Sequence, residues 1–273
     1  LELARVFGVD ELLNPSTAKA IYDECTAKLQ TEEFRGQALM KKFNVKVVCT
    51  TDDPADSLEF HQQIKDNPFG VKVLPAWRPD KAMNIEKPEY LDYLDKLAAV
   101  TGRTEIVTFA QLKEALKDRM KFFASMGCNV SDHALEYVMY APASDEELEA
   151  IFLKRLNHMI LNREEELKFK TAFMLFMGRE YNRLNWTMQL HYGVKRDNNK
   201  GMFNKIGPDT GFDCISNNSP SWQLADFLNA LAITDELPKT IIYSLNPNDN
   251  PAIGTIIGCF QDSSAIGKIQ QGS

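Results

Sequence analysis

Five side chains suited to chemistry stand close behind, or within, short apolar runs of the sequence. His191 follows one such run and can polarise or bind a substrate oxygen through its imidazole ring. Arg196 lies five residues later, and Arg78 stands between Trp77 and a proline. A guanidinium group can grip a carboxylate through two parallel hydrogen bonds, which a lysine cannot do. We therefore predict catalytic roles for His191 and Asp132, and substrate contacts for Arg78, Arg196 and Trp77.

Each of these residues also has an explanation that involves no ligand. His191 can be a core histidine, Arg196 a solvated loop residue and Arg78 the partner of Asp80 in a surface ion pair. The segment Ser131-Asp-His133 contains the three residue types of a nucleophilic triad, but adjacent residues of an extended chain point to opposite faces. One member of that segment, Asp132 or His133, is therefore expected to face the site.

The elements that must position these residues are five short β-type runs. Each run is followed at once by a polar cluster that is rich in proline, glycine or acidic residues. The runs cover residues 45–49, 71–74, 128–130, 186–190 and 240–245. The chain end at 269–273 also resembles a strand that enters a loop. Parallel strands that alternate with helices gather such clusters at one edge of the sheet, where α/β proteins bind ligands.

Segments with helical periodicity lie between the runs. We expect helices over residues 55–66, 88–100, 108–126, 145–157, 162–184, 220–232 and 252–260. Thr108 is the expected N-cap of the third of these. The sequence has neither a G-x-G-x-x-G turn nor a phosphate-loop motif, which favours an α/β barrel over a doubly wound nucleotide-binding fold.

Composition narrows the class of protein. The chain has 273 residues, a net charge of −7 and a pI near 5.3, which argues against nucleic acid or an anionic membrane as a partner. It lacks both an apolar run of membrane-spanning length, about 18 residues, and a signal segment, so we expect a cytoplasmic protein. The five cysteines and four histidines form neither a Cys-x-x-Cys nor a His-x-His pair. No complete set of metal ligands is therefore expected within the chain.

Several of these clusters together resemble one known family. They are Cys49-Thr-Thr-Asp-Asp-Pro54, Trp77-Arg-Pro-Asp-Lys81, Ser131-Asp-His133, Met188-Gln-Leu-His-Tyr-Gly-Val-Lys-Arg196 and Ile206-Gly-Pro-Asp-Thr-Gly-Phe-Asp213. In this order and spacing they resemble uronate isomerase, also called glucuronate isomerase, of the amidohydrolase superfamily.

The resemblance implies a fold and a reaction. The fold is a (β/α)8 TIM-type barrel with helical insertions, of which this chain would hold about strands 2 to 6 as an internal portion, residues 1–273, of a single domain. The reaction interconverts D-glucuronate with D-fructuronate, and D-galacturonate with D-tagaturonate. His191 matches the family's active-site histidine after the fifth strand, Arg78 and Arg196 match substrate-contacting arginines, and Asp132 matches an aspartate after the fourth strand.

The sequence also departs from the family pattern. The family's His-x-His after the first strand and Asp-x-Arg after the eighth strand have no counterpart here. These motifs hold a divalent metal, such as zinc, so the resemblance implies metal ligands outside this chain and no turnover by the chain alone. The expected partner is a uronate sugar, with a homo-oligomer possible. Two alternatives stay open: a hydrolase of the same superfamily, and an inactive structural portion of the barrel.

Overall fold

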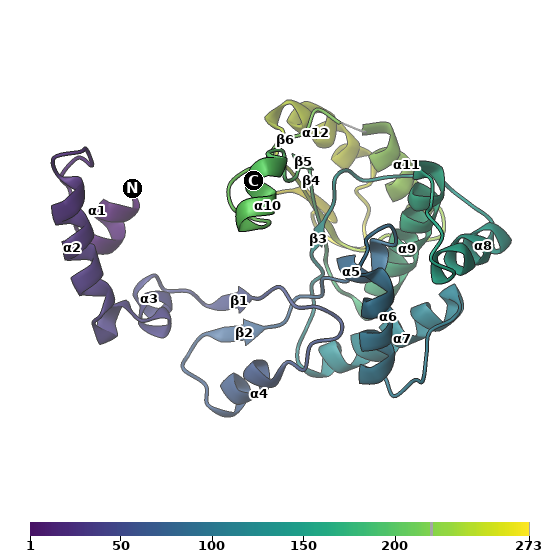
Figure 1. Ribbon diagram of the computed structural model, residues 1–273, viewed down its shortest axis with the longest axis horizontal. Helices are drawn as coiled ribbons and strands as arrows, with labels where there is room; N and C mark the ends of the chain where they lie inside the picture. Colours follow the sequence, from purple (N-terminus) through teal and green to yellow (C-terminus); the bar gives the residue numbers. More distant parts are fainter. Residues whose placement is uncertain (219–220, 273) are drawn as a thin grey trace. The chain divides into compact units, whose positions relative to one another are not determined.

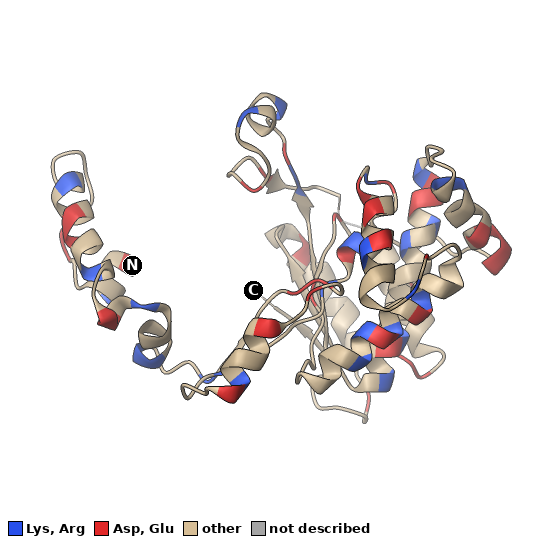
Figure 2. Ribbon diagram, turned by 60° about the horizontal axis from the view of Figure 1, so that its bottom comes forward, with Lys and Arg blue, Asp and Glu red and all other residues tan. Residues whose placement is uncertain are grey.

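The chain divides into two compact units. The computed structural model describes residues 1–218 and 221–272. One unit consists of residues 1–49 and 59–74, and the other of residues 50–58 and 75–273. The structure is a mixed α/β fold with parallel sheets. Figure 2 shows acidic and basic residues interspersed along the helices of both units.

The first unit pairs two short parallel strands and carries several helices. Its helices are α1 (Glu2–Phe7), α2 (Ala18–Leu29), η1 (Glu32–Phe34), α3 (Gly36–Lys42) and α4 (Glu59–Asp66). Strands β1 (Val47–Cys49) and β2 (Lys72–Leu74) lie side by side, with Val48 opposite Val73. Both strands were predicted at these positions. The predicted helix over 55–66 is wrong in its first turn: Leu58 has a φ of +56°, which interrupts a right-handed helix, and α4 begins only at Glu59.

The second unit contains a parallel sheet whose strand order follows the chain. Its strands are β3 (His133–Ala134), β4 (Met188–Tyr192), β7 (Thr240–Ser244) and β8 (Ile269–Gln271). Isolated parallel bridges add the segments at Asp52, Trp77 and Ser131 in the same order. The predicted strands at 186–190 and 240–245, and the strand at the chain end, are confirmed. The run at 128–130 contributes one bridge, Val130 to Thr187, before β3 begins.

The second unit also contains the helices that accompany this sheet. They are α5 (Asp80–Met83), α6 (Tyr90–Val100), α7 (Phe109–Ser125), α8 (Asp145–Leu156), α9 (Arg163–Leu184), α11 (Ser221–Ala232), η2 (Pro247–Asp249) and α12 (Asn250–Cys259). Figure 1 shows α5 to α9 and α11 on one side of the sheet. The predicted helices agree with them to within two residues, and Thr108 caps α7 as predicted. Pro220, the predicted start of the sixth helix, lies outside the described residues. No helix in the described ranges is long and apolar enough to cross a membrane.

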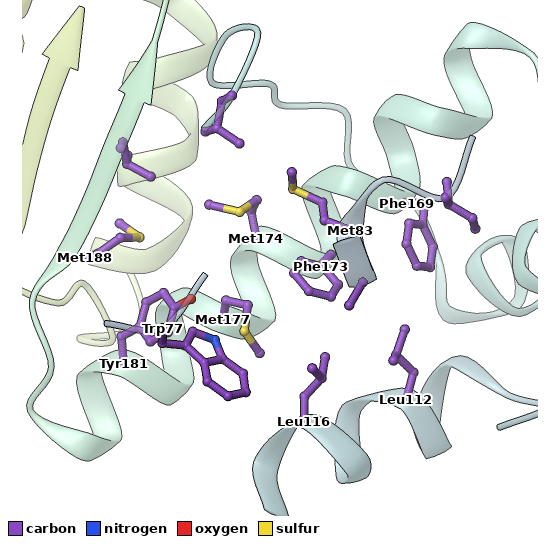
Figure 3. Close-up of a cluster of buried hydrophobic side chains, with 14 of the residues drawn as sticks. Trp77, Met83, Leu112, Leu116, Phe169, Phe173, Met174, Met177, Tyr181 and Met188 are labelled. Atoms are coloured by element: carbon purple, nitrogen blue, oxygen red, sulfur yellow. The ribbon is translucent and has the colours of Figure 1, made fainter. Parts of the chain in front are cut away.

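The core of the second unit forms where these helices meet the sheet. Figure 3 shows aromatic and methionine side chains of α9 between Met188 of β4 and leucines of α7. Along β4 burial alternates, with Met188, Leu190 and Tyr192 buried and Gln189 and His191 only partly covered. This period of two is that of a strand with one face on the core. The opposite face of β4 is therefore the one that presents polar groups.

A small excursion between β4 and β7 was not predicted as regular structure. It contains β5 (Val194–Lys195) and β6 (Cys214–Ile215), which pair antiparallel, and α10 (Lys200–Ile206). Asn199 caps α10 by accepting a hydrogen bond from the Met202 amide. The pattern of this stretch is weak because none of α10 is buried, so it lacks the apolar stripe by which a helix is recognised in a sequence.

The cap of α9 gives a test of how local sequence stabilises this fold. Asn162 accepts a hydrogen bond from the Glu165 amide, and the Glu165 carboxylate accepts one from the Asn162 amide, which forms a capping box. We expect Asn162→Ala to lower the free energy of unfolding by about 1 kcal/mol. Asn162→Asp should retain stability, since aspartate also caps and its charge suits the helix dipole. Equal losses in both variants, measured by urea denaturation, would contradict the capping role.

Candidate active site

Three chain segments of the second unit bring Arg78, Asp132 and His191 together. The Arg78 amide donates to the Asp52 carbonyl at 2.9 Å, and the Asp132 amide donates to the Trp77 carbonyl at 2.9 Å. His191 lies on β4, on the face that is only partly covered. The parallel pairing of these segments thus fixes the backbone from which each side chain extends.

The Asp132 carboxylate is the centre of this cluster. Its Oδ2 accepts from Arg78 Nη2, and its Oδ1 lies 2.7 Å from His191 Nδ1. Thr51 Oγ1 lies 3.5 Å from Oδ2, at the outer limit of a hydrogen bond. Only 10% of the Asp132 side chain is exposed, against 35% for Arg78 and 44% for His191. The cluster is therefore a buried carboxylate beneath two groups that a ligand can reach.

The charges around Asp132 keep its carboxylate ionised. Burial by itself raises the pKa of Asp132, because a charged form is costly away from water. The polar contact with His191 and the positive charge of Arg78 act in the other direction and outweigh burial. The net effect is that the pKa of Asp132 is lowered from its ordinary value.

This arrangement defines what His191 can do. His191 Nδ1 lies 2.7 Å from Asp132 Oδ1, a separation that favours a proton on this nitrogen although the two atoms are not aligned as a hydrogen bond. The other ring nitrogen, Nε2, is then free to accept a proton from a ligand or to return it. A carboxylate that orients a histidine in this way also stabilises the imidazolium that forms when the ring takes up a proton.

The sequence reading missed two residues that complete the surroundings of His191. The Tyr243 ring stacks on the imidazole, with ring centroids 4.2 Å apart and planes 12° apart. The Tyr243 hydroxyl donates to Gln189 Oε1 at 2.8 Å. The spacing of Gln189 and His191, two residues apart on one strand, is a signal that they share a face. No comparable signal links Tyr243 to them, because it lies 52 positions further along the chain.

The predicted substrate contact of Trp77 is not supported. Its side chain has no exposed surface, and it packs edge-on against Phe123 and Trp186 in the core shown in Figure 3. The structure assigns the neighbouring residues to opposite faces, so that Trp77 supports the core while Arg78 reaches the cluster. The aromatic residue beside the arginine is a packing residue because the strand alternates.

The choice between Asp132 and His133 is resolved in the same way. His133 is fully buried, with Nδ1 at 3.0 Å from Asp80 Oδ1 and Nε2 at 2.9 Å from the Tyr181 hydroxyl. Asp80 also accepts a hydrogen bond from the Ala134 amide. His133 is therefore a satisfied core residue. The alternative in which Arg78 pairs with Asp80 is wrong, since Asp80 binds His133.

Arg196 belongs to a different group of charges. Its Nη1 lies 3.1 Å from both Asp209 Oδ1 and Asp213 Oδ2, and half of its side chain is exposed. Arg196 also lines a hollow of about 350 Å³ together with Lys170. Its contacts within the described ranges do not join it to Asp132, so its role in substrate binding stays a prediction.

The residues described here do not assemble a metal centre by themselves. Across residues 1–218 and 221–272, no group of three or more His, Cys, Asp or Glu side chains could hold an ion. The negative charge of Asp132 is already balanced by the guanidinium of Arg78. A guanidinium at such a distance also repels a divalent cation. The divalent metal that the resemblance implies does not fit this cluster.

Comparison with known proteins agrees with the resemblance. A family model described as glucuronate isomerase matches residues 1–273. The uronate isomerases of Lachnospira eligens and Lachnoclostridium phytofermentans are each 62% identical over the whole chain, and the chain covers 58% and 59% of their lengths. The crystal structure of a uronate isomerase from Thermotoga maritima has a TM-score of 0.89 at 32% identity, covering 100% of this chain and 58% of that one.

The chain thus spans a little under three fifths of the length of the relatives that it matches. The match runs through the segments that carry Arg78, Asp132 and His191, and through the excursion that carries Arg196. This chain belongs to the glucuronate isomerase, or uronate isomerase, family.

Proposed function

We propose that the complete gene product that contains this chain interconverts aldose and ketose hexuronates. D-Glucuronate and D-fructuronate form one substrate pair, and D-galacturonate and D-tagaturonate the other. The observation that supports the proposal is the contact of Asp132 with both Arg78 and His191, which brings a guanidinium group and an imidazole ring to one carboxylate. Membership of the family supports the same reaction class. We further propose that the chain's two units belong to one (β/α)8 barrel domain.

The reaction moves two protons. One leaves C2 of the open-chain sugar and arrives at C1, while a second passes from the C2 oxygen to the C1 oxygen as the carbonyl group moves. In our proposal the His191 Nε2 polarises these oxygens and exchanges the second proton with them. Asp132 holds the imidazole in the required tautomer through Nδ1 and, being ionised, stabilises the charged ring.

Arg78 is proposed to bind the C6 carboxylate. Its side chain keeps 35% exposure although one nitrogen is engaged by Asp132, so part of the fork can still reach a ligand. Within the described residues its Nε has no hydrogen-bond partner. This nitrogen is also buried, so the exposed remainder of the Arg78 side chain is the part that can contact a ligand. Arg196, with half its side chain exposed, is proposed as a second contact to the sugar.

The activity is tested directly on the complete gene product. Incubation with D-glucuronate should yield D-fructuronate, detected by chromatography of the ketose or by the NMR signals of the product. The same protein should leave amide and ester substrates unchanged. Turnover of an amide together with no ketose from either aldose would reject isomerisation in favour of a hydrolase of the same superfamily.

Arg78→Lys tests the carboxylate contact. Lysine keeps the positive charge but loses the planar fork, so we expect KM for D-glucuronate to rise about tenfold or more, with a smaller change in kcat. Steady-state kinetics of the complete gene product provide the measurement. Lys268→Arg, in an ion pair with Asp262 at another place, is the control for a basic exchange. An unchanged KM would remove Arg78 from the carboxylate site.

Asp132→Asn tests the orientation of His191. The amide cannot stabilise an imidazolium ring, so we expect kcat to fall by about 10²–10⁴-fold. Asp262→Asn removes an aspartate of comparable size from the surface pair with Lys268 and should leave kcat unchanged. A kcat within twofold of wild type would show that Asp132 does not act on His191.

The same variant has a predicted pH signature in stability. Because the folded-state pKa of Asp132 is lowered, its carboxylate stabilises the fold at pH values above about 3.9, the unfolded value. That contribution is lost as pH falls through the lower folded-state pKa. Wild type should therefore exceed Asp132→Asn in unfolding free energy at pH 7, and the difference should shrink in acid.

A further inference from the structure

The ring of Tyr243 is the closest aromatic neighbour of His191 in this site. The two residues are direct partners in the pairing of β4 with β7, and their rings lie parallel with centroids 4.2 Å apart. In a parallel sheet, directly paired residues point to the same face. Tyr243 therefore covers one face of the imidazole, while 44% of the His191 side chain stays exposed.

Tyr243 is itself fixed at two further points. Its hydroxyl donates to Gln189 Oε1 at 2.8 Å, and Gln189 Nε2 donates to the Ser131 carbonyl at 3.3 Å. Gln189 thus ties the tyrosine to the segment that carries Asp132, the other partner of His191. Burial, together with the negative charge of Asp132, raises the pKa of Tyr243, so its hydroxyl keeps the proton that this hydrogen bond requires.

Gly272 also confines the Tyr243 ring, which fills the space left by the missing side chain of this glycine. Its amide donates to the Ile242 carbonyl at 2.9 Å, which extends the pairing of β7 with β8. A Cβ atom on Gly272 would lie 1.9 Å from Cε1 and 2.2 Å from Cδ1 of Tyr243. Real atoms cannot approach so closely, so the tyrosine ring occupies space that only glycine leaves open.

We infer that Tyr243 is a positioning residue for His191. Gln189 and Gly272 hold the Tyr243 ring in place, and this ring sets the plane of the imidazole. Asp132 fixes the ring through one nitrogen, which still permits rotation about that contact. A parallel aromatic face removes this rotation, because tilting the imidazole would break the stack. This role deepens the isomerase function proposed above and rests on it.

The proposal predicts a separation between kcat and KM. Tyr243→Leu removes both the ring and the hydroxyl, and we expect kcat to fall about tenfold, since an aromatic pair contributes about 0.5–1.5 kcal/mol. KM should change by less than about twofold, because Tyr243 acts through His191 and not on the substrate. Tyr243→Phe keeps the stack and should recover most of kcat. Ile241→Val, on the same face of β7, is the matched control and should resemble wild type.

Gly272→Ala tests the steric part of the proposal. The added methyl group forces the Tyr243 ring to move, so kcat should fall to a similar extent as in Tyr243→Leu. In the Tyr243→Leu background the same glycine substitution should cause no further loss, because the clashing ring is gone. Such strong non-additivity is the mark of two residues that act through one contact. Additive losses would overturn the proposed link between Gly272 and Tyr243.

A readout independent of turnover separates this proposal from the proposed function. In the complete gene product, the ring-proton NMR signals of His191 can be assigned as those that are lost in His191→Gln. Stacking on an aromatic face displaces these signals by ring current. The displacement should persist in Tyr243→Phe and disappear in Tyr243→Leu and Gly272→Ala. Unchanged His191 signals or unchanged kcat in a folded Tyr243→Leu protein would overturn the positioning role, whereas an inactive wild type with the displacement intact would overturn only the isomerase function.

Discussion

The candidate site depends on a buried carboxylate that a guanidinium and an imidazole keep ionised. Burial works against the charge of Asp132, and the contacts with His191 and Arg78 more than compensate. A carboxylate with so little exposed surface would otherwise take up a proton or disrupt the fold. The contacts with Arg78 and His191 thus keep the buried Asp132 carboxylate charged, and the same carboxylate orients His191. Stability and chemistry at this point have one physical origin.

The alternation of strand residues separates the core from the site at each of these positions. Trp77 lies beside Arg78 and is fully buried, and His133 lies beside Asp132 and is fully buried. Leu190, which precedes His191, is buried as well. Each site residue thus follows or precedes a core residue whose packing fixes the backbone. The interactions of His133 with Asp80 and Tyr181 serve the core side of this arrangement.

The outer helices contribute to the site by holding the strands in register. Helix α9 packs against α8, α11 and α5, and its Tyr181 hydroxyl contacts His133 of β3. A hollow of about 800 Å³ lies among α7, α8 and α9, and none of the proposed site residues lines it. Size alone is therefore a poor guide to the site here, and the convergence of charged and aromatic groups at the strand ends is a better one.

The sequence by itself determined the longer strands of the parallel sheets, most helices and the members of the charged cluster. Apolar runs of period two and capping residues are local signals, so β4, β7, α7 and α9 could be placed from them. The motifs were specific enough to indicate the family, with Arg78, Asp132 and His191 in the site. Tertiary structure decided what depends on packing between distant segments. It buried Trp77, resolved Asp132 from His133, and stacked Tyr243 on His191 above Gly272. These outcomes follow from strand register and side-chain volume. The spacing of residues along one segment determines neither of them.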